Sequence, residues 1–140
     1  SGFRIKAYTD MEIDLENRCF IGGIKTKAGK ERTVPIHSSI YSLVANRADG
    51  SRNLLLARPD AFRKYMYTAL EHLGIEKHTP HDCRHTFSML CERYGVNEND
   101  RKRMLGHSFG SDITNAKYGH RSLEELRSEI EKIQAPDICY

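Results

Sequence analysis

The chain has 140 residues, of which 39% are hydrophobic and 29% charged, a balance typical of a folded globular protein rather than a disordered one. Its 16.1 kDa suffice for one domain with a single packed core. No apolar run approaches the roughly 20 residues that span a bilayer, and no signal peptide opens the chain. We therefore expect a cytoplasmic protein without membrane association. The net charge of +3 permits an anionic partner without demonstrating one.

The cysteines carry no pairing pattern. Cys19, Cys83, Cys91 and Cys139 are scattered along the chain without a C-x-x-C pair. That spacing argues against both a zinc ribbon and a disulfide framework. We interpret all four as free thiols of a reducing compartment.

A β-hairpin with a basic tip is the first clear element. Residues that favour β-structure lie on both sides of the basic segment 25–30, namely Phe20, Ile21 and Ile24 before it and Val34 and Ile36 after it. Pro35 marks the end of the second strand or places that strand at a sheet edge.

The remainder of the chain is predicted to be mainly helical. The apolar spacing becomes helical from Ser38 onward, with Ser38 or Ser39 as the cap. Further helices are predicted at about 60–73, from Thr79 to a stop at Gly95, at about 97–105, and from Ser122 to Ile133. Core packing is the expected role of their apolar stripes. The predicted class is α+β, mainly helical with a small antiparallel β-hairpin or sheet.

The stretch His81-Asp82-Cys83-Arg84-His85 carries the clearest chemistry. Helical residues three and four apart share a face, so His81, Arg84 and His85 should project together near a helix start. Free N–H groups and the helix dipole favour phosphate there, and an arginine fork can grip two phosphate oxygens. The alternative is a capped helix whose histidines and arginine make ordinary contacts.

Two histidines at this spacing also raise the possibility of zinc. The metalloprotease pattern needs glutamate where this chain has Asp82, and no third ligand follows at a familiar spacing. We therefore predict neither a metal nor a cofactor.

The ordered set of motifs resembles a known family. His-x-x-Arg-His at 81–85, Leu-Gly-His-Ser at 105–108 and Thr-x-x-x-Tyr at 114–118 look like the catalytic domain of the tyrosine recombinases, the phage and transposon integrase family. The interval from Arg84 to His107 also resembles the spacing of the corresponding residues in that family. The resemblance implies that residues 1–140 form a single catalytic domain, the C-terminal part of a longer integrase whose N-terminal DNA-binding domain is absent.

The resemblance also implies roles for individual residues. Tyr118 matches the nucleophile that attacks the scissile phosphate to form a 3′-phosphotyrosyl bond and free a 5′ hydroxyl. Arg84 resembles the second phosphate-clamping arginine. His81 and His107 resemble the residues that position the phosphate and assist proton movement. His85 is expected to support the catalytic residues without contacting the phosphate itself.

Two further catalytic positions are less clearly matched to the family. One has two candidate residues, and the other lies in a stretch that departs from the family pattern. Lys25 resembles the hairpin lysine that protonates the leaving 5′ oxygen, with Lys27 as the alternative. Arg4 resembles the first clamping arginine, although Ala7 stands where the family usually has an acidic residue. Lys27, Lys30 and Arg32 are predicted to contact the DNA backbone.

The implied function is a site-specific DNA recombinase or integrase with chemistry like that of type IB topoisomerases. Its partner is double-stranded DNA, on which the family assembles as a homo-tetramer, although this fragment could be monomeric. The predicted helix after Tyr118 docks either on a neighbouring protomer or on its own domain. One alternative function is a DNA-binding relic of the same fold without catalysis. Another is an unrelated helical interaction module in which the motifs arose by chance.

Overall fold

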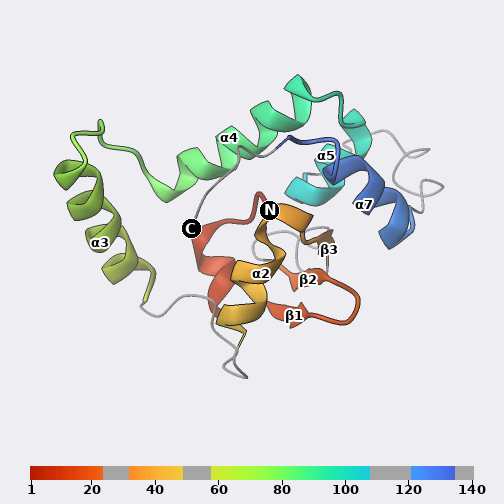
Figure 1. Ribbon diagram of the computed structural model, residues 1–140, viewed down its shortest axis with the longest axis horizontal. Helices are drawn as coiled ribbons and strands as arrows, with labels where there is room; N and C mark the ends of the chain where they lie inside the picture. The colour runs from red at the N-terminus through yellow and green to blue at the C-terminus, as the bar shows by residue number, and fades with distance from the viewer. Residues whose placement is uncertain (24–31, 49–57, 108–120, 135–140) are drawn as a thin grey trace.

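The computed structural model describes residues 1–23, 32–48, 58–107 and 121–134 (Figure 1). The elements in chain order are a 3₁₀-helix η1 (Ile5–Thr9), strands β1 (Glu12–Asp14), β2 (Cys19–Gly22) and β3 (Arg32–Pro35), and helices α2 (Ser38–Arg47), α3 (Pro59–His72), α4 (Pro80–Arg93), α5 (Glu98–Leu105) and α7 (Leu123–Ile130). Over these ranges the chain is mainly helical with one small sheet, which confirms the predicted fold class. No helix within them has both the length and the apolar composition of a membrane span.

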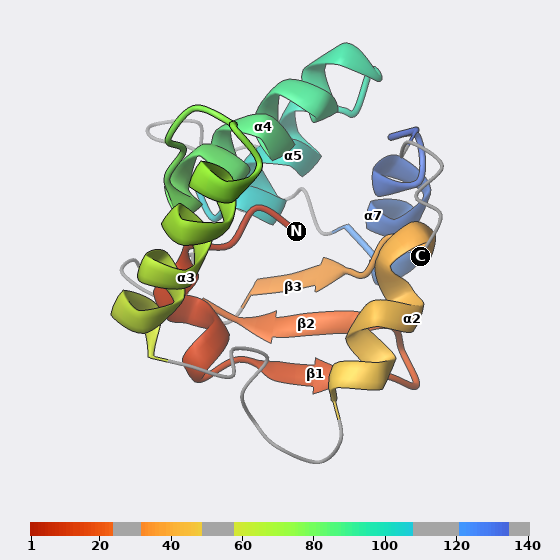
Figure 2. The ribbon, with the colours of Figure 1, turned by 60° about the vertical axis from the view of Figure 1, so that its left-hand side comes forward.

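The sheet has three antiparallel strands in the order β1-β2-β3 (Figure 2). Phe20 of β2 pairs with Val34 of β3, as the predicted hairpin requires. Pro35 is the last residue of β3, which is an edge strand of this sheet. An edge position tolerates proline because proline has no N–H to donate to a neighbouring strand. The basic tip of the hairpin lies outside the described residues.

Local capping sets three of the predicted helix ends. At the start of α4, the carboxylate of Asp82 accepts hydrogen bonds from the N–H (2.7 Å) and the hydroxyl (3.1 Å) of Thr79. Ser122 and Glu125 form the same reciprocal capping box at α7. Gly106 ends α5 in the left-handed conformation, with φ of 68°. These three boundaries were predicted from sequence and are confirmed.

The start of α2 differs from its prediction. The capping residue is His37 rather than Ser38 or Ser39, because its Nδ1 accepts the Ser39 N–H at 3.1 Å while its Nε2 contacts the carbonyl of Ile133 at 2.8 Å. Ser38 instead donates its N–H and hydroxyl to the carboxylate of Glu131, at 2.7 and 2.6 Å. A distant segment therefore determines where α2 begins.

The core lies between the sheet and helices α4, α5 and α7. Figure 2 shows α4 and α5 beyond the β3 edge, with α7 near one end of that strand. Helix α7 packs against β3 of its own chain and buries Leu126 and Ile130. Packing on its own chain is one of the two docking modes considered for this helix, and docking on a neighbouring protomer stays a prediction. The buried apolar residues of the core are Phe3, Ala7, Met11, Phe20, Val34, Ile36, Val44, Phe87, Cys91, Val96, Met104, Leu105, Ile130 and Ile133.

The prediction that α3 packs into the core is wrong. No residue of this helix is buried, and Tyr65 and Leu73 on its predicted apolar stripe are 67% and 71% exposed. In both views α3 lies on the opposite side of the molecule from α7 (Figures 1 and 2). Helical periodicity shows that one face is apolar but does not show which surface covers it.

Gly2 holds the N-terminal segment in a conformation that other residues resist. Its φ is +65°, and a Cβ built there would lie 2.5 Å from Cδ1 of Phe87 and 2.9 Å from Cδ2 of Leu105. Gly74 has nearly the same φ, +63°, but no atom lies within 4 Å of its Cβ position. A side chain would suffer backbone strain at both positions, but it would be crowded by neighbouring atoms only at Gly2.

We expect Gly2→Ala to lower the free energy of unfolding by about 2–4 kcal/mol, because left-handed strain adds to overpacking. Gly74→Ala should cost only the strain, about 1–2 kcal/mol. Urea unfolding of both variants measures the difference. Equal losses would show that the Phe87 and Leu105 side chains move aside without cost.

Candidate active site

Arg84 occupies the centre of the candidate site. It lies on the inner face of α4 and is only 5% exposed. Its Nη1 donates to the carbonyl of Gly2 at 2.5 Å, and its Nη2 donates to the carbonyl of Leu105 at 2.6 Å. Both of these acceptors are neutral backbone oxygens. The two bonds therefore orient the guanidinium without neutralising its charge.

These hydrogen bonds bring two other predicted site residues close to Arg84. Arg4 follows Gly2 by two residues, and His107 follows Leu105 by two residues. Gly106 turns the chain at the end of α5, so that His107 leaves the helix and is exposed. The N-terminal segment and the end of α5 thus meet at the guanidinium of Arg84, although Arg4 and His107 are far apart in sequence.

The electrostatics of this group are strongly positive. Burial, and then Arg4, lower the pKa of Arg84. Although His107 is exposed, its partial burial, followed by Arg84, Arg4, Arg101 and Arg32, lowers its pKa below the ordinary value. Each of these causes disfavours a further positive charge. Arg4, Arg84 and His107, which we call the cation cluster, therefore form a region suited to an anion.

Arg32 lies beside the cation cluster rather than on the surface. It is 9% exposed, and its guanidinium carbon lies 4.1 Å from the centre of the Phe3 ring. Burial, and then Arg84 and Arg4, lower its pKa to about 10, so Arg32 remains protonated at neutral pH. A DNA contact by Arg32 stays a prediction. Because the side chain is buried, Arg32 acts on its surroundings through its charge, which also lowers the pKa of His107.

His81 and His85 project from the first turns of α4 as predicted, and both are exposed. Their rings are in edge-to-face contact, with centroids 4.6 Å apart. His81 also lines a cavity of about 290 Å³, which it shares with Arg4 and with two cations that sequence analysis missed, Lys6 and Arg63. No local sequence signal joins Lys6 of η1 to Arg63 of α3, because the fold alone brings them together.

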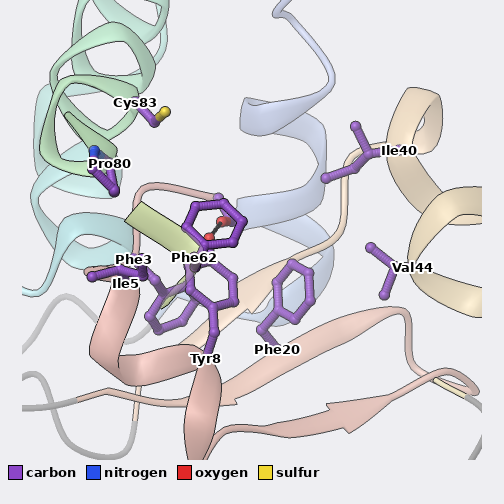
Figure 3. Close-up of a pocket in the computed structure, with 10 residues that line it drawn as sticks. Phe3, Ile5, Tyr8, Phe20, Ile40, Val44, Phe62, Pro80 and Cys83 are labelled. Carbon is purple, nitrogen blue, oxygen red and sulfur yellow. Dashed lines mark hydrogen bonds between the residues drawn. The ribbon is translucent and has the colours of Figure 1, made fainter. Parts of the chain in front are cut away.

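A second cavity, of about 320 Å³, has a different character (Figure 3). The rings of Phe3, Tyr8, Phe20 and Phe62 gather around it. The hydroxyl groups of Ser1 and Tyr8 are hydrogen-bonded at 2.5 Å. None of the predicted site residues that the structure describes lines this apolar cavity, whereas Arg4 and His81 line the first one.

Several predicted site residues lie outside the described residues, namely Tyr118, Lys25, Lys27 and Lys30. Of the predicted set, the structure brings together Arg4, Arg84 and His107, and it places His81 in a cavity with Arg4. Within the described ranges, no three histidine, cysteine or acidic side chains gather in a way that could hold a metal ion. Sequence analysis missed the backbone carbonyls of Gly2 and Leu105, which have no side-chain signature.

Comparison with known proteins gives two matches. The model of the phage integrase family matches residues 1–125. A tyrosine recombinase, XerA of Saccharolobus solfataricus, is 32% identical over an alignment of 125 residues, which covers 86% of this chain and 41% of the relative. The chain thus spans about two fifths of the length of that relative. No solved structure matches the chain significantly.

Replacing Arg84 by lysine tests the bridge between the two carbonyls. One ammonium group cannot reach both acceptors of the guanidinium fork, so Arg84→Lys should leave a buried carbonyl unsatisfied and cost about 1–3 kcal/mol of unfolding free energy. Arg93→Lys, an exposed substitution on the same helix, should change stability by less than about 0.5 kcal/mol. Urea unfolding checks both values, and indistinguishable midpoints would refute the bridging role.

His107 should titrate at a lower pH than an ordinary histidine, whose pKa is 6.5, because burial and four arginines disfavour its imidazolium. Arg4→Gln should raise its pKa in the free protein. Inorganic phosphate should also raise it, since an anion in the cation cluster favours the protonated ring. An NMR titration of the ring protons measures all three values. No response to phosphate would argue against an anion site at His107.

Proposed function

The chain belongs to the phage integrase family, and from that premise we propose that it is the catalytic domain of a tyrosine-type DNA strand transferase. It would cleave and rejoin double-stranded DNA through a 3′-phosphotyrosyl intermediate, as an integrase or site-specific recombinase. In this proposal, residues 1–140 form the C-terminal catalytic part of a longer protein that acts as a tetramer on DNA.

The cation cluster is the observation that carries the proposal. A phosphodiester carries one negative charge, and in-line attack on it concentrates charge on the nonbridging oxygens. Arg84 is fixed by two neutral carbonyls and keeps its full charge, while Arg4 and His107 lie beside it. The two arginines are preorganised cations, which stabilise a transition state without reorganising during the reaction, whereas His107 is mainly neutral near pH 7.

The proposed reaction exchanges one phosphoester bond for another. The oxygen of Tyr118 forms a bond to phosphorus as the bond to the 5′ oxygen breaks, and Lys25, or Lys27 in its place, gives a proton to that leaving oxygen. Neutral imidazole can accept the tyrosine proton, and the lowered pKa of His107 favours this neutral form. Because the phosphotyrosyl bond conserves the energy of the phosphodiester, attack by a 5′ hydroxyl rejoins the strand without ATP.

The cavity beside the cation cluster supports a DNA contact. Arg4, Lys6, Arg63 and His81 line it, next to the N-terminus of α4 where Pro80 begins the helix. Lysine and arginine contacts to phosphate give affinity, whereas sequence is read through contacts to base edges. We therefore expect the isolated chain to bind DNA weakly and with little sequence preference at physiological salt.

The test is covalent trapping on a nicked suicide DNA substrate with the complete natural protein. The wild-type protein should accumulate a DNA adduct, and Tyr118→Phe should form none because it lacks the attacking oxygen. Tyr65→Phe is the matched control, since Tyr65 is 67% exposed on α3 and has no role in the proposed reaction. This control should form adduct at the wild-type level.

Two results would contradict the proposal in different ways. An adduct that persists in Tyr118→Phe would mean that another residue is the nucleophile. DNA binding by the wild-type protein without any adduct would favour the non-catalytic relic. In the second case, the cation cluster would serve only to hold the phosphate backbone.

A further inference from the structure

An ion pair between Asp100 and Arg121 joins α5 to the residue just before the capping box of α7. Asp100 is 1% exposed, whereas the Arg121 side chain is 31% exposed. The Nε of Arg121 donates to both carboxylate oxygens at 3.0 Å, and its Nη2 donates to Oδ2 at 2.6 Å. This bond raises the pKa of Arg121. The geometry is a two-point grip that fixes both the position and the direction of the arginine.

Further contacts hold each partner of this pair in place. The Nη1 of Arg121 also donates to Oε1 of Glu125 at 2.8 Å, which ties Arg121 to the first turn of α7. The N–H of Asp100 donates to Oδ1 of Asn97, the residue that caps α5. Nη1 of Arg103 also lies 3.6 Å from Oδ1 of Asp100. The pair therefore connects two helix starts that are each fixed by their own capping contacts.

The location of the pair matters more than its strength. Arg121 follows Tyr118 by three residues, so covalent geometry keeps the two Cα atoms within about 11 Å of each other. Asp100 precedes Leu105 by five residues, a rise of about 7.5 Å along α5. Leu105 is the residue whose carbonyl holds Arg84. One short helix therefore fixes the phosphate-binding arginine near one end and Arg121 near the other.

The same helix bounds the whole segment that contains Tyr118. Residues 108–120 lie outside the described residues, but the residues on either side of them are described. His107 follows α5 directly after Gly106, the residue that ends the helix. Arg121 contacts α5 through its hydrogen bond to Asp100. Loss of the Asp100 contact would detach Arg121, the first described residue after this segment, from α5.

We propose that Asp100 and Arg121 are positioning residues that set the distance between Tyr118 and the cation cluster. This inference rests on the proposed role of Tyr118 as the nucleophile. The pair does not touch the reacting atoms, and it acts by fixing the chain three residues beyond them. A displacement of about 1 Å at a reacting group can cost on the order of 100-fold in rate.

A purely structural role predicts a different outcome from a positioning role. A buried ion pair often contributes little net stability, since desolvation offsets the attraction, and well-packed apolar residues can replace it without loss. The double substitution Asp100→Leu with Arg121→Met should therefore preserve the fold. If the pair served only stability, that double variant would also preserve the cleavage rate.

The experiment measures single-turnover cleavage of a suicide DNA substrate by the complete natural protein at saturating concentration. Asp100→Asn, Arg121→Gln and the double variant should each slow adduct formation on the order of 10- to 100-fold. In the Tyr118→Phe background, the same changes should alter DNA affinity less than about threefold, because the cation cluster is intact. Urea unfolding should show the double variant near the wild-type midpoint.

Arg127→Gln is the matched control. Arg127 also ties α7 to the rest of the chain, through the carbonyls of Asn17 at 2.6 Å and Arg18 at 3.4 Å. It lies farther along the chain from Tyr118 than Arg121 does. We expect this control to reduce stability while leaving the single-turnover cleavage rate within about twofold of wild type.

The possible outcomes separate the two proposals. A double variant that is folded, binds DNA and cleaves at the wild-type rate would overturn the positioning role while leaving the nucleophile assignment intact. Cleavage that slows equally in Arg127→Gln would also overturn it, because a general loss of α7 docking would then explain the effect. A wild-type protein that forms no adduct, or an adduct that survives Tyr118→Phe, would overturn the proposed function and this inference with it.

Discussion

The arrangement of the site depends on one buried arginine whose hydrogen-bond partners are backbone carbonyls. Arg84 binds the oxygens of Gly2 and Leu105 and so joins the N-terminal segment to the end of α5. A carboxylate partner would have held the guanidinium equally well, but it would also have neutralised it. Carbonyl dipoles satisfy the N–H groups and leave the positive charge available to a ligand. The carbonyl at the end of α5 adds the favourable dipole of a helix C-terminus.

The chain uses its arginines in two distinct ways. Arg84 and Arg32 are buried near other cations, which lowers the pKa of both groups. Arg121 grips the carboxylate of Asp100, which raises its pKa. The first arrangement is unfavourable for the folded protein until an anion binds, whereas the second neutralises its charges within the fold. Buried cations that lie close together are expected at functional sites, where ligand binding is favoured at the expense of local stability.

The limits of sequence analysis follow from the range of each interaction. The starts of α4 and α7 were predictable because Thr79 and Ser122 contact residues three positions ahead. The site motifs were also recognisable, since they are continuous stretches of side chains. The bridge at Arg84 was not, because its acceptors are backbone atoms far away in the chain. Periodicity failed at α3 for a related reason, since it identified an apolar face but not the surface that covers it.

The docking of α7 on its own chain gives the site its remaining constraint. Leu126 and Ile130 are buried in the core, and Glu131 caps the start of α2 through Ser38. Detaching this helix without a replacement would therefore expose apolar surface and remove a cap from α2 at the same time. Arg121 is held between this docked helix and α5, because it donates hydrogen bonds to both Glu125 and Asp100. Helix α5 thus contacts both arginines, Arg84 through the carbonyl of Leu105 and Arg121 through the carboxylate of Asp100.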